Sequence, residues 1–199
     1  MVRSLRQISD KLINGTATPD IIGLTQQVTA GHGVSVNASS PLVLQDLYKT
    51  ALLCRGTDDF IGGYGGRYWV SNESALRQVF YLLDQAGRSV EFRHDPDLDA
   101  NLPLVFGVPW LISDAVATAS GTPDTTKIYV VQLSGPTAIR ILYAKDPNNV
   151  CDSWGLHVYE IPLQASKNNF YAGVSGFYAV HVPEDQVIVC LNGVELNNI

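Results

Sequence analysis

The chain has 199 residues, of which 46% are hydrophobic and only 16% charged, with a formal net charge of −6. A composition this apolar excludes a disordered chain, and the low charged fraction indicates that other subunits cover some apolar surface. The acidic balance excludes a basic face for sequence-specific nucleic-acid binding. No apolar run is long enough to cross a bilayer, and the N-terminal stretch lacks the apolar core of a signal peptide. We therefore expect a soluble protein that is made in the cytoplasm.

Two helices are predicted in the first quarter of the chain. Apolar residues at helical spacing predict a helix over residues 1–14, which stops before Gly15. Residues 16–40 are rich in Gly, Thr, Ser and Asn, so we expect an irregular connection with at most a short strand. The second helix begins near Pro41, and its apolar stripe covers residues 44–52.

A loop, a strand and a third helix follow. Residues 55–66 end in GGYGG and predict a loop, and residues 68–70 predict a short buried strand. Either Ser71 or Asn72 caps the next helix, which Gly87 ends.

The rest of the chain is dominated by strands. We expect strands at residues 89–93 and 108–113, separated by the loop DPDLDANLP, and a last pair at 177–182 and 186–191. Because helices and strands interleave irregularly, the pattern predicts an α+β fold rather than a doubly wound α/β sheet.

Residues 128–163 carry the clearest strand pattern. The segments IYVVQL, AIRILY and GLHVYEIPL are rich in β-branched and aromatic residues and are bounded by turn residues. We expect these three segments to form an antiparallel meander, which is an architectural feature and not a reaction centre.

Three scattered cysteines, Cys54, Cys151 and Cys190, form no Cys-x-x-Cys pair. An odd number at wide spacing is typical of buried thiols in a reducing compartment rather than of disulfides or zinc ligands. The sequence therefore predicts no metal and no cofactor.

The motifs that resemble reactive or binding sites are incomplete. The GGYGG sequence at 62–66 lacks the Gly-Lys-Ser/Thr of a phosphate-binding loop. Asp95, Asp97 and Asp99 alternate as in a calcium loop, but the positions that need Gly and Glu are Ala100 and Phe106. The four histidines share no metal-ligand spacing. We therefore expect a protein that is not an enzyme.

Two other classes of function stay open. A small hydrolase would pair His94 or His181 with Asp95 or Asp185, because each histidine has an acidic residue nearby in the sequence. A monomeric binding module would hold its ligand at the GGYGG loop, which contains Tyr64.

The order of segments along the chain resembles a known family. A capping asparagine precedes a helix, which is followed by DQAGR, GVPWLISD, KIYVVQLSGPTAIRILY, WGLHVYEIP and VSGFYAVHVPEDQVIVCLNG. This series is similar to the C-terminal two-thirds of tailed-bacteriophage major capsid proteins with the Hong Kong 97-type fold. No piece is specific alone, and the order of the pieces carries the resemblance.

The resemblance implies an axial domain and a peripheral domain with a spine helix and a long antiparallel sheet. The parts would be the end of the spine helix and a connection (1–39), the axial domain (40–126), the peripheral sheet and its loop (127–172) and strands returning to the axial domain (173–199). It also implies that the N-terminal arm and the extended loop of the family are missing from this chain.

The family also implies a function. The chain would be a structural subunit of a phage or prophage capsid, self-assembling into pentamers and hexamers around packaged DNA, with other virion proteins as further partners. An encapsulin-like nanocompartment shell is the alternative within the same fold. Subunit contacts are expected in three loops, at Asp58, Asp59 and Tyr64, at Asp95, Asp97 and Asp99, and at Asn148, Asn149 and Trp154. The location would be the virion, after synthesis in the cytoplasm of a bacterial host.

Overall fold

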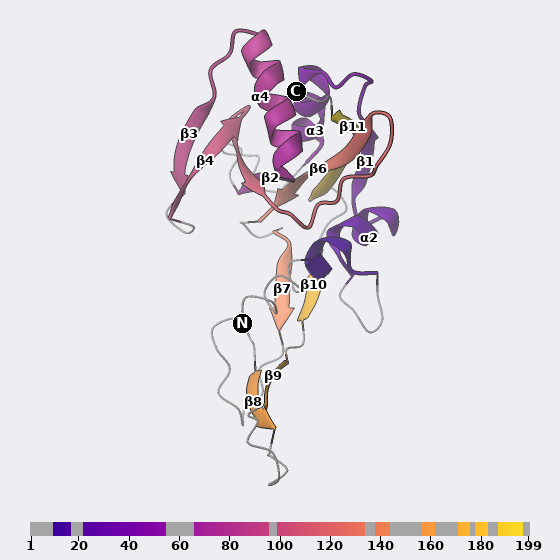
Figure 1. Ribbon diagram of the computed structural model, residues 1–199, viewed down its shortest axis with the longest axis vertical. Helices are drawn as coiled ribbons and strands as arrows, with labels where there is room; N and C mark the ends of the chain where they lie inside the picture. The colour runs from indigo at the N-terminus through magenta and orange to yellow at the C-terminus, as the bar shows by residue number, and fades with distance from the viewer. Residues whose placement is uncertain are drawn as a thin grey trace.

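The computed structural model describes residues 10–16, 22–54, 66–95, 99–133, 138–143, 157–161, 171–175, 178–182 and 187–196. Within these residues its largest feature is a seven-stranded sheet with both parallel and antiparallel neighbours (Figure 1). The strands, in spatial order, are β1 (Val34–Asn37), β11 (Ile188–Leu196), β6 (Asp124–Gln132), β2 (Arg67–Ser71), β5 (Val108–Ile112), β4 (Ala100–Val105) and β3 (Glu91–Asp95).

Two short antiparallel ribbons lie beyond one end of this sheet (Figure 1). The nearer ribbon pairs β7 (Arg140–Tyr143) with β10 (Tyr178–His181). The farther ribbon pairs β8 (His157–Ile161) with β9 (Tyr171–Ser175). The described residues therefore form a wide body with a narrow extension.

Strand β6 is the centre of the sheet, because it pairs with β11 on one side and β2 on the other. Ile128 and Val130 point into one apolar cluster, and Tyr129 and Val131 point into another on the opposite face. All four side chains are at most 1% exposed. The core thus consists of two apolar layers, one on each face of the sheet.

Helices cover both faces. Helices α3 (Leu44–Leu53) and α4 (Glu73–Gln85) supply Leu47, Leu76 and Val79 to the first cluster. The short helix α2 (Leu24–Thr29) and the helical residues 10–14 pack against the second cluster. No helix in the described part of the chain is long and apolar enough to span a membrane.

Side-chain caps fix the starts of α3 and α4. The carboxylate of Asp46 accepts hydrogen bonds from the backbone N–H of Ser39 (2.9 Å) and of Val43 (3.4 Å). Asn72 caps α4, accepting a 2.9 Å bond from the backbone N–H of Ala75. Both helices were predicted, and Asn72 is the cap rather than Ser71.

Two stacked tryptophans anchor the middle of the sheet. The rings of Trp69 and Trp110 are 5.2 Å apart at 20°, and both side chains are fully buried. Each indole N–H is satisfied, since Trp69 donates to the carbonyl of Val105 (3.1 Å) and Trp110 to the hydroxyl of Ser71 (2.9 Å). The predicted buried strand at 68–70 and the strand at 108–113 are thus confirmed as β2 and β5.

The meander expected over residues 128–163 is wrong. All three segments contain a strand, but β6 pairs with β11 and β2, β7 with β10, and β8 with β9. The physical reason is that residues 128–131 pack into apolar clusters on both faces, as a central strand requires, whereas a meander with one solvated face would alternate. The pair expected at 177–182 and 186–191 is likewise present as β10 and β11, which do not pair with each other.

Some elements were not predicted. Helix α2 has only six residues, and its N-cap residue is Gly23, which offers no side-chain cap. Strand β4 begins inside the segment DPDLDANLP, which was predicted as a loop, and it contains Pro103. That proline lies opposite Phe92 of β3 and outside the β4–β5 pairs, which involve only Leu104 and Val105. Its missing N–H therefore costs no bond to β5.

Candidate subunit-contact surfaces

Only two of the predicted contact residues can be placed. Asp95 ends β3, and Asp99 immediately precedes β4. The remaining predicted contact residues lie outside the described residues: Asp58, Asp59, Tyr64, Asp97, Asn148, Asn149 and Trp154.

The two aspartates have different surroundings. The carboxylate of Asp95 is buried and accepts a 3.0 Å hydrogen bond from the hydroxyl of Tyr68 in β2. The side chain of Asp99 is 98% exposed, and its carboxylate lies 3.9 Å from Nε2 of His94. Asp95 therefore ties the β3–β4 hairpin to the sheet, and Asp99 remains available to a partner. A regular alternation of aspartates in the sequence could not show this difference.

The β3–β4 hairpin forms one edge of the sheet, and β3 is its outer strand (Figure 1). Residues 91–94 are all exposed, and the Phe92 side chain is 64% exposed. An exposed edge strand carries unpaired backbone groups that can pair with another chain. This hairpin is therefore a candidate contact surface by both its backbone and its side chains.

A second surface lies on the outer side of α3. Tyr48 and Leu52 are 46% and 51% exposed, and Leu53 is also exposed. Here α3 borders a groove of about 330 Å³, which we call the α3 groove, lined by Leu44, Gln45, Tyr48, Arg88 and Phe106. The sequence held a signal for this surface, because LQDLYKTALL is apolar on more than one side of the helix.

Aromatic and cationic contacts form the wall of the α3 groove. The rings of Tyr48 and Phe106 meet edge to face with centroids 5.8 Å apart. The guanidinium carbon of Arg88 lies 6.0 Å from the centroid of Phe106, at the outer limit of a cation–π contact. The groove therefore combines an apolar surface with a positive charge.

Phe106 has an unusual backbone conformation. It forms the two-residue turn between β4 and β5 together with Gly107, and φ is +54° at Phe106 and +76° at Gly107. Positive φ at both central residues is typical of a type I′ turn, in which Asn-Gly is strongly preferred. A bulky aromatic at positive φ is strained by about 1–3 kcal/mol.

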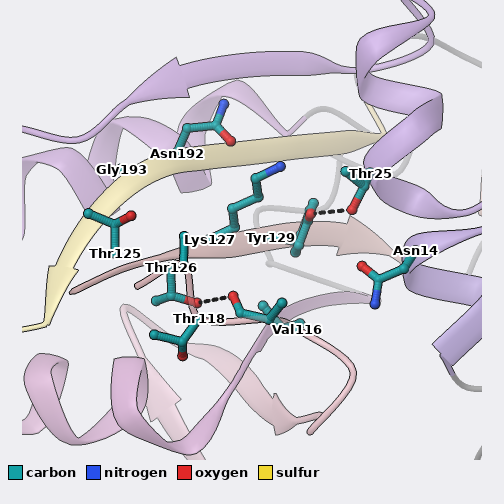
Figure 2. A pocket seen from close by; sticks show the side chains of 12 residues that line it. Asn14, Thr25, Val116, Thr118, Thr125, Thr126, Lys127, Tyr129, Asn192 and Gly193 are labelled. Carbon is teal, nitrogen blue, oxygen red and sulfur yellow. Dashed lines mark hydrogen bonds between the residues drawn. The ribbon is translucent and has the colours of Figure 1, made fainter. Parts of the chain in front are cut away.

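A third surface is a depression of about 230 Å³ on the other face of the sheet, with polar and apolar groups in its lining (Figure 2). Its lining includes Thr25, Thr118, Lys127, Tyr129 and Asn192. The hydroxyls of Thr25 and Tyr129 are 2.8 Å apart and point toward each other (Figure 2). Burial raises the pKa of the Tyr129 hydroxyl well above its usual value, so Tyr129 is a neutral hydrogen-bonding group.

No arrangement for catalysis occurs in the described residues. Burial raises the pKa of the Cys190 thiol to about 11, which makes it a poor nucleophile at neutral pH. No cluster of His, Cys, Asp or Glu in that part of the chain could hold a metal ion. His94 faces the exposed Asp99, and the carboxylate of Asp95 is bound to Tyr68. Asp185, the other candidate acid, lies outside the described residues.

No protein-family model matches the chain, and no curated protein sequence matches it. Solved structures do match. The holo-SrpI encapsulin complex from Synechococcus elongatus has a TM-score of 0.73 and 17% identity over 99% of this chain. The capsid of a native gene transfer agent (GTA) particle has a TM-score of 0.61 and 12% identity over 96% of this chain. The capsid of the empty GTA particle has a TM-score of 0.59 and 13% identity over 96% of this chain.

These matches show the fold. The chain has the Hong Kong 97-type capsid fold, as the sequence resemblance predicted, and its α+β class is confirmed. The chain spans 63% of the length of the encapsulin and 62% of that of the native GTA capsid protein.

Proposed function

We propose that this protein is a structural subunit of a closed protein shell, in which it acts by binding other copies of itself. The observation that carries the proposal is a likeness to shell proteins that extends over 96–99% of the chain. Two further observations agree with a role in assembly rather than in catalysis. The Cys190 thiol is un-ionised, and α3 exposes apolar side chains.

The physical mechanism is repeated weak association. A heterologous contact repeated about an axis closes into a ring, and rings joined by a second type of contact close into a shell. Each contact can be weak because many contacts act together. In this proposal the axial part comprises residues 40–126 with 173–199, and the peripheral part comprises 1–39 with 127–172. The loops at Asp58–Tyr64 and Asp95–Asp99 point toward the axes.

Two kinds of content are possible for such a shell. We propose a capsid of phage or prophage origin that encloses DNA, assembled in a bacterial cytoplasm with other virion proteins as further partners. The second candidate is an encapsulin-like compartment, and the specific observation in its favour is the higher TM-score, 0.73 against 0.61. A net charge of −6 weakens non-specific adhesion to DNA and is compatible with either content.

Sedimentation velocity of the purified protein tests the proposal. We expect rings of five or six subunits or a much faster particle fraction. Protein that remains monomeric at high concentration would contradict a shell function. The contents of the particles distinguish the two candidates. The particle fraction is treated with nuclease, which removes outside DNA, and is then disrupted so that its contents can be analysed. DNA that survived the nuclease supports the capsid, and a co-purified protein without DNA supports the compartment.

A further inference from the structure

Two surfaces with exposed aromatic side chains are left uncovered by the described residues of this chain. One is the outer side of α3 with the α3 groove, and the other is the β3–β4 hairpin with Phe92. Helix α3 packs on β11 and forms one wall of the groove. Phe106, in the other wall, directly follows β4, so the groove borders the base of the hairpin in the same copy.

The outer side of α3 differs from that of α4. Helix α4 presents Glu73 and Arg77 to solvent, joined by a 2.7 Å ion pair, and its one exposed large hydrophobic side chain is Tyr81. Helix α3 presents three, Tyr48, Leu52 and Leu53. A solvent-facing helix normally carries polar residues on its outer face. The α4 pattern fits contact with water, and the α3 pattern fits contact with protein.

The strained turn points to the same surface. Asn-Gly would form the β4–β5 turn without strain, yet the chain has Phe106 there. The Phe106 ring contacts Tyr48 and Arg88 and forms a wall of the α3 groove. Strained residues that persist in a fold often serve a binding surface.

The two surfaces are complementary in charge. Arg88 lines the α3 groove, and Lys49 is exposed beside Tyr48 on the outer side of α3. The hairpin exposes two carboxylates, Glu91 and Asp99, and one guanidinium, Arg93, which gives its exposed side chains a formal charge of −1 with His94 neutral. The groove thus carries positive charge, and the hairpin carries one exposed aromatic ring and a small net negative charge.

We propose that the α3 groove of one copy receives the β3–β4 hairpin of a second copy. The Phe92 ring then packs against the Tyr48 and Phe106 rings, and the hairpin carboxylates face Arg88 and Lys49. Because the two surfaces are different, the contact is heterologous and repeats around a ring. This inference rests on the proposed shell function and names the partner surface for one of its contacts.

Site-specific photo-crosslinking tests the contact directly. A p-benzoylphenylalanine at position 48 is irradiated in assemblies of mixed ¹⁵N-labelled and unlabelled copies, and the adducts are mapped by mass spectrometry. We expect mixed-isotope adducts with residues 91–104. Adducts confined to one copy, or to other segments, would overturn the proposal. The matched control is the same probe at Tyr81 of α4, which is 43% exposed and should give no adduct with that hairpin.

Assembly thresholds provide the second readout. We expect Tyr48→Ser and Phe92→Ser each to raise the protein concentration needed for assembly by about tenfold or more, as loss of a central aromatic contact does. The Tyr81→Ser control should change this threshold concentration by less than about twofold. A Phe106→Asn variant excludes misfolding as the cause, because Asn-Gly suits the turn. Its melting temperature should stay within about 3 °C of the original while its assembly weakens.

The outcomes distinguish this inference from the proposed function. Unmodified protein that never assembles contradicts both. Unmodified protein that assembles, with Tyr48→Ser and Phe92→Ser assembling at the same concentration, contradicts the hairpin contact alone and leaves the shell function standing.

Discussion

At the scale of single residues, Asn72 connects three parts of the body. Its side-chain oxygen caps α4, and its Nδ2 donates to the carbonyl of Val116 and the hydroxyls of Thr118 and Thr126 at 2.9–3.3 Å. Asn72, Val116 and Thr126 are buried, so loss of the bonds among them leaves polar groups with little access to water. Asn72 therefore fixes α4, the 116–118 segment and the start of β6 relative to one another.

Replacing Asn72 should destabilise the subunit. Asn72→Ala removes a helix cap, at about 1 kcal/mol, and leaves buried partners unpaired, at about 1–3 kcal/mol. We expect a loss of about 2–4 kcal/mol in the free energy of unfolding, measured by urea denaturation. Asn72→Asp keeps the cap acceptor and should lose less. Ser74→Ala, at an exposed position in the same helix, is the control, and an Asn72→Ala loss as small as that of the control would disprove the assignment.

The buried thiols give a second test at this scale. Cys54 and Cys190 are buried thiols, and with a pKa of about 11 only about one Cys190 thiol in a thousand is ionised at pH 8. In a Cys151→Ser background, we expect no rapid reaction of the folded protein with a disulfide reagent. Two thiols should react after unfolding in guanidinium. A fast reaction in the folded protein would show that one of these cysteines is accessible.

Sequence reasoning at the residue scale narrowed the cap of α4 to two residues but did not reach the contact surfaces. Ser71 and Asn72 were both candidates because an N-cap is a local signal beside its own helix. The different surroundings of Asp95 and Asp99 depend on Tyr68, which is distant in the chain. The groove at Tyr48 and Phe106 joins a helix to a turn far along the sequence. No local pattern reports such contacts.

At the scale of elements, strand type was predictable and strand pairing was not. Helices α3 and α4 and strands β2 and β5 follow from periodicity and turn residues. The partners of β6 do not, because pairing depends on which other apolar strands need cover. The clue was present in residues 128–131, which are apolar on both faces and so indicate a central strand rather than a hairpin arm.

The central position of β6 leads to a prediction for hydrogen exchange. Its amides bond to β11 and β2 and lie between two buried layers, so their exchange requires nearly complete unfolding. At concentrations where subunits stay apart, mass spectrometry should find the slowest exchange in peptides from β6 and β11. Peptides from the β3 edge should exchange much faster. Equal protection of β3 and β6 in isolated subunits would contradict the sheet order.

At the scale of the whole molecule, the wide body and the narrow extension give the chain several separate surfaces for neighbours (Figure 1). The order of weak sequence signals was enough to predict the fold, because a fold constrains the succession of its elements more than any one motif. The same order carried no information on the content of a shell, which depends on surfaces and partners and not on topology.

Electron microscopy of the fast-sedimenting fraction tests the central claim most directly. We expect rings with five or six subunits, or closed hollow particles, in which each subunit shows the body and extension of Figure 1. The purified protein is also concentrated further and imaged again. If the images then show only single subunits, or irregular aggregates without rotational symmetry, they contradict a shell-forming subunit.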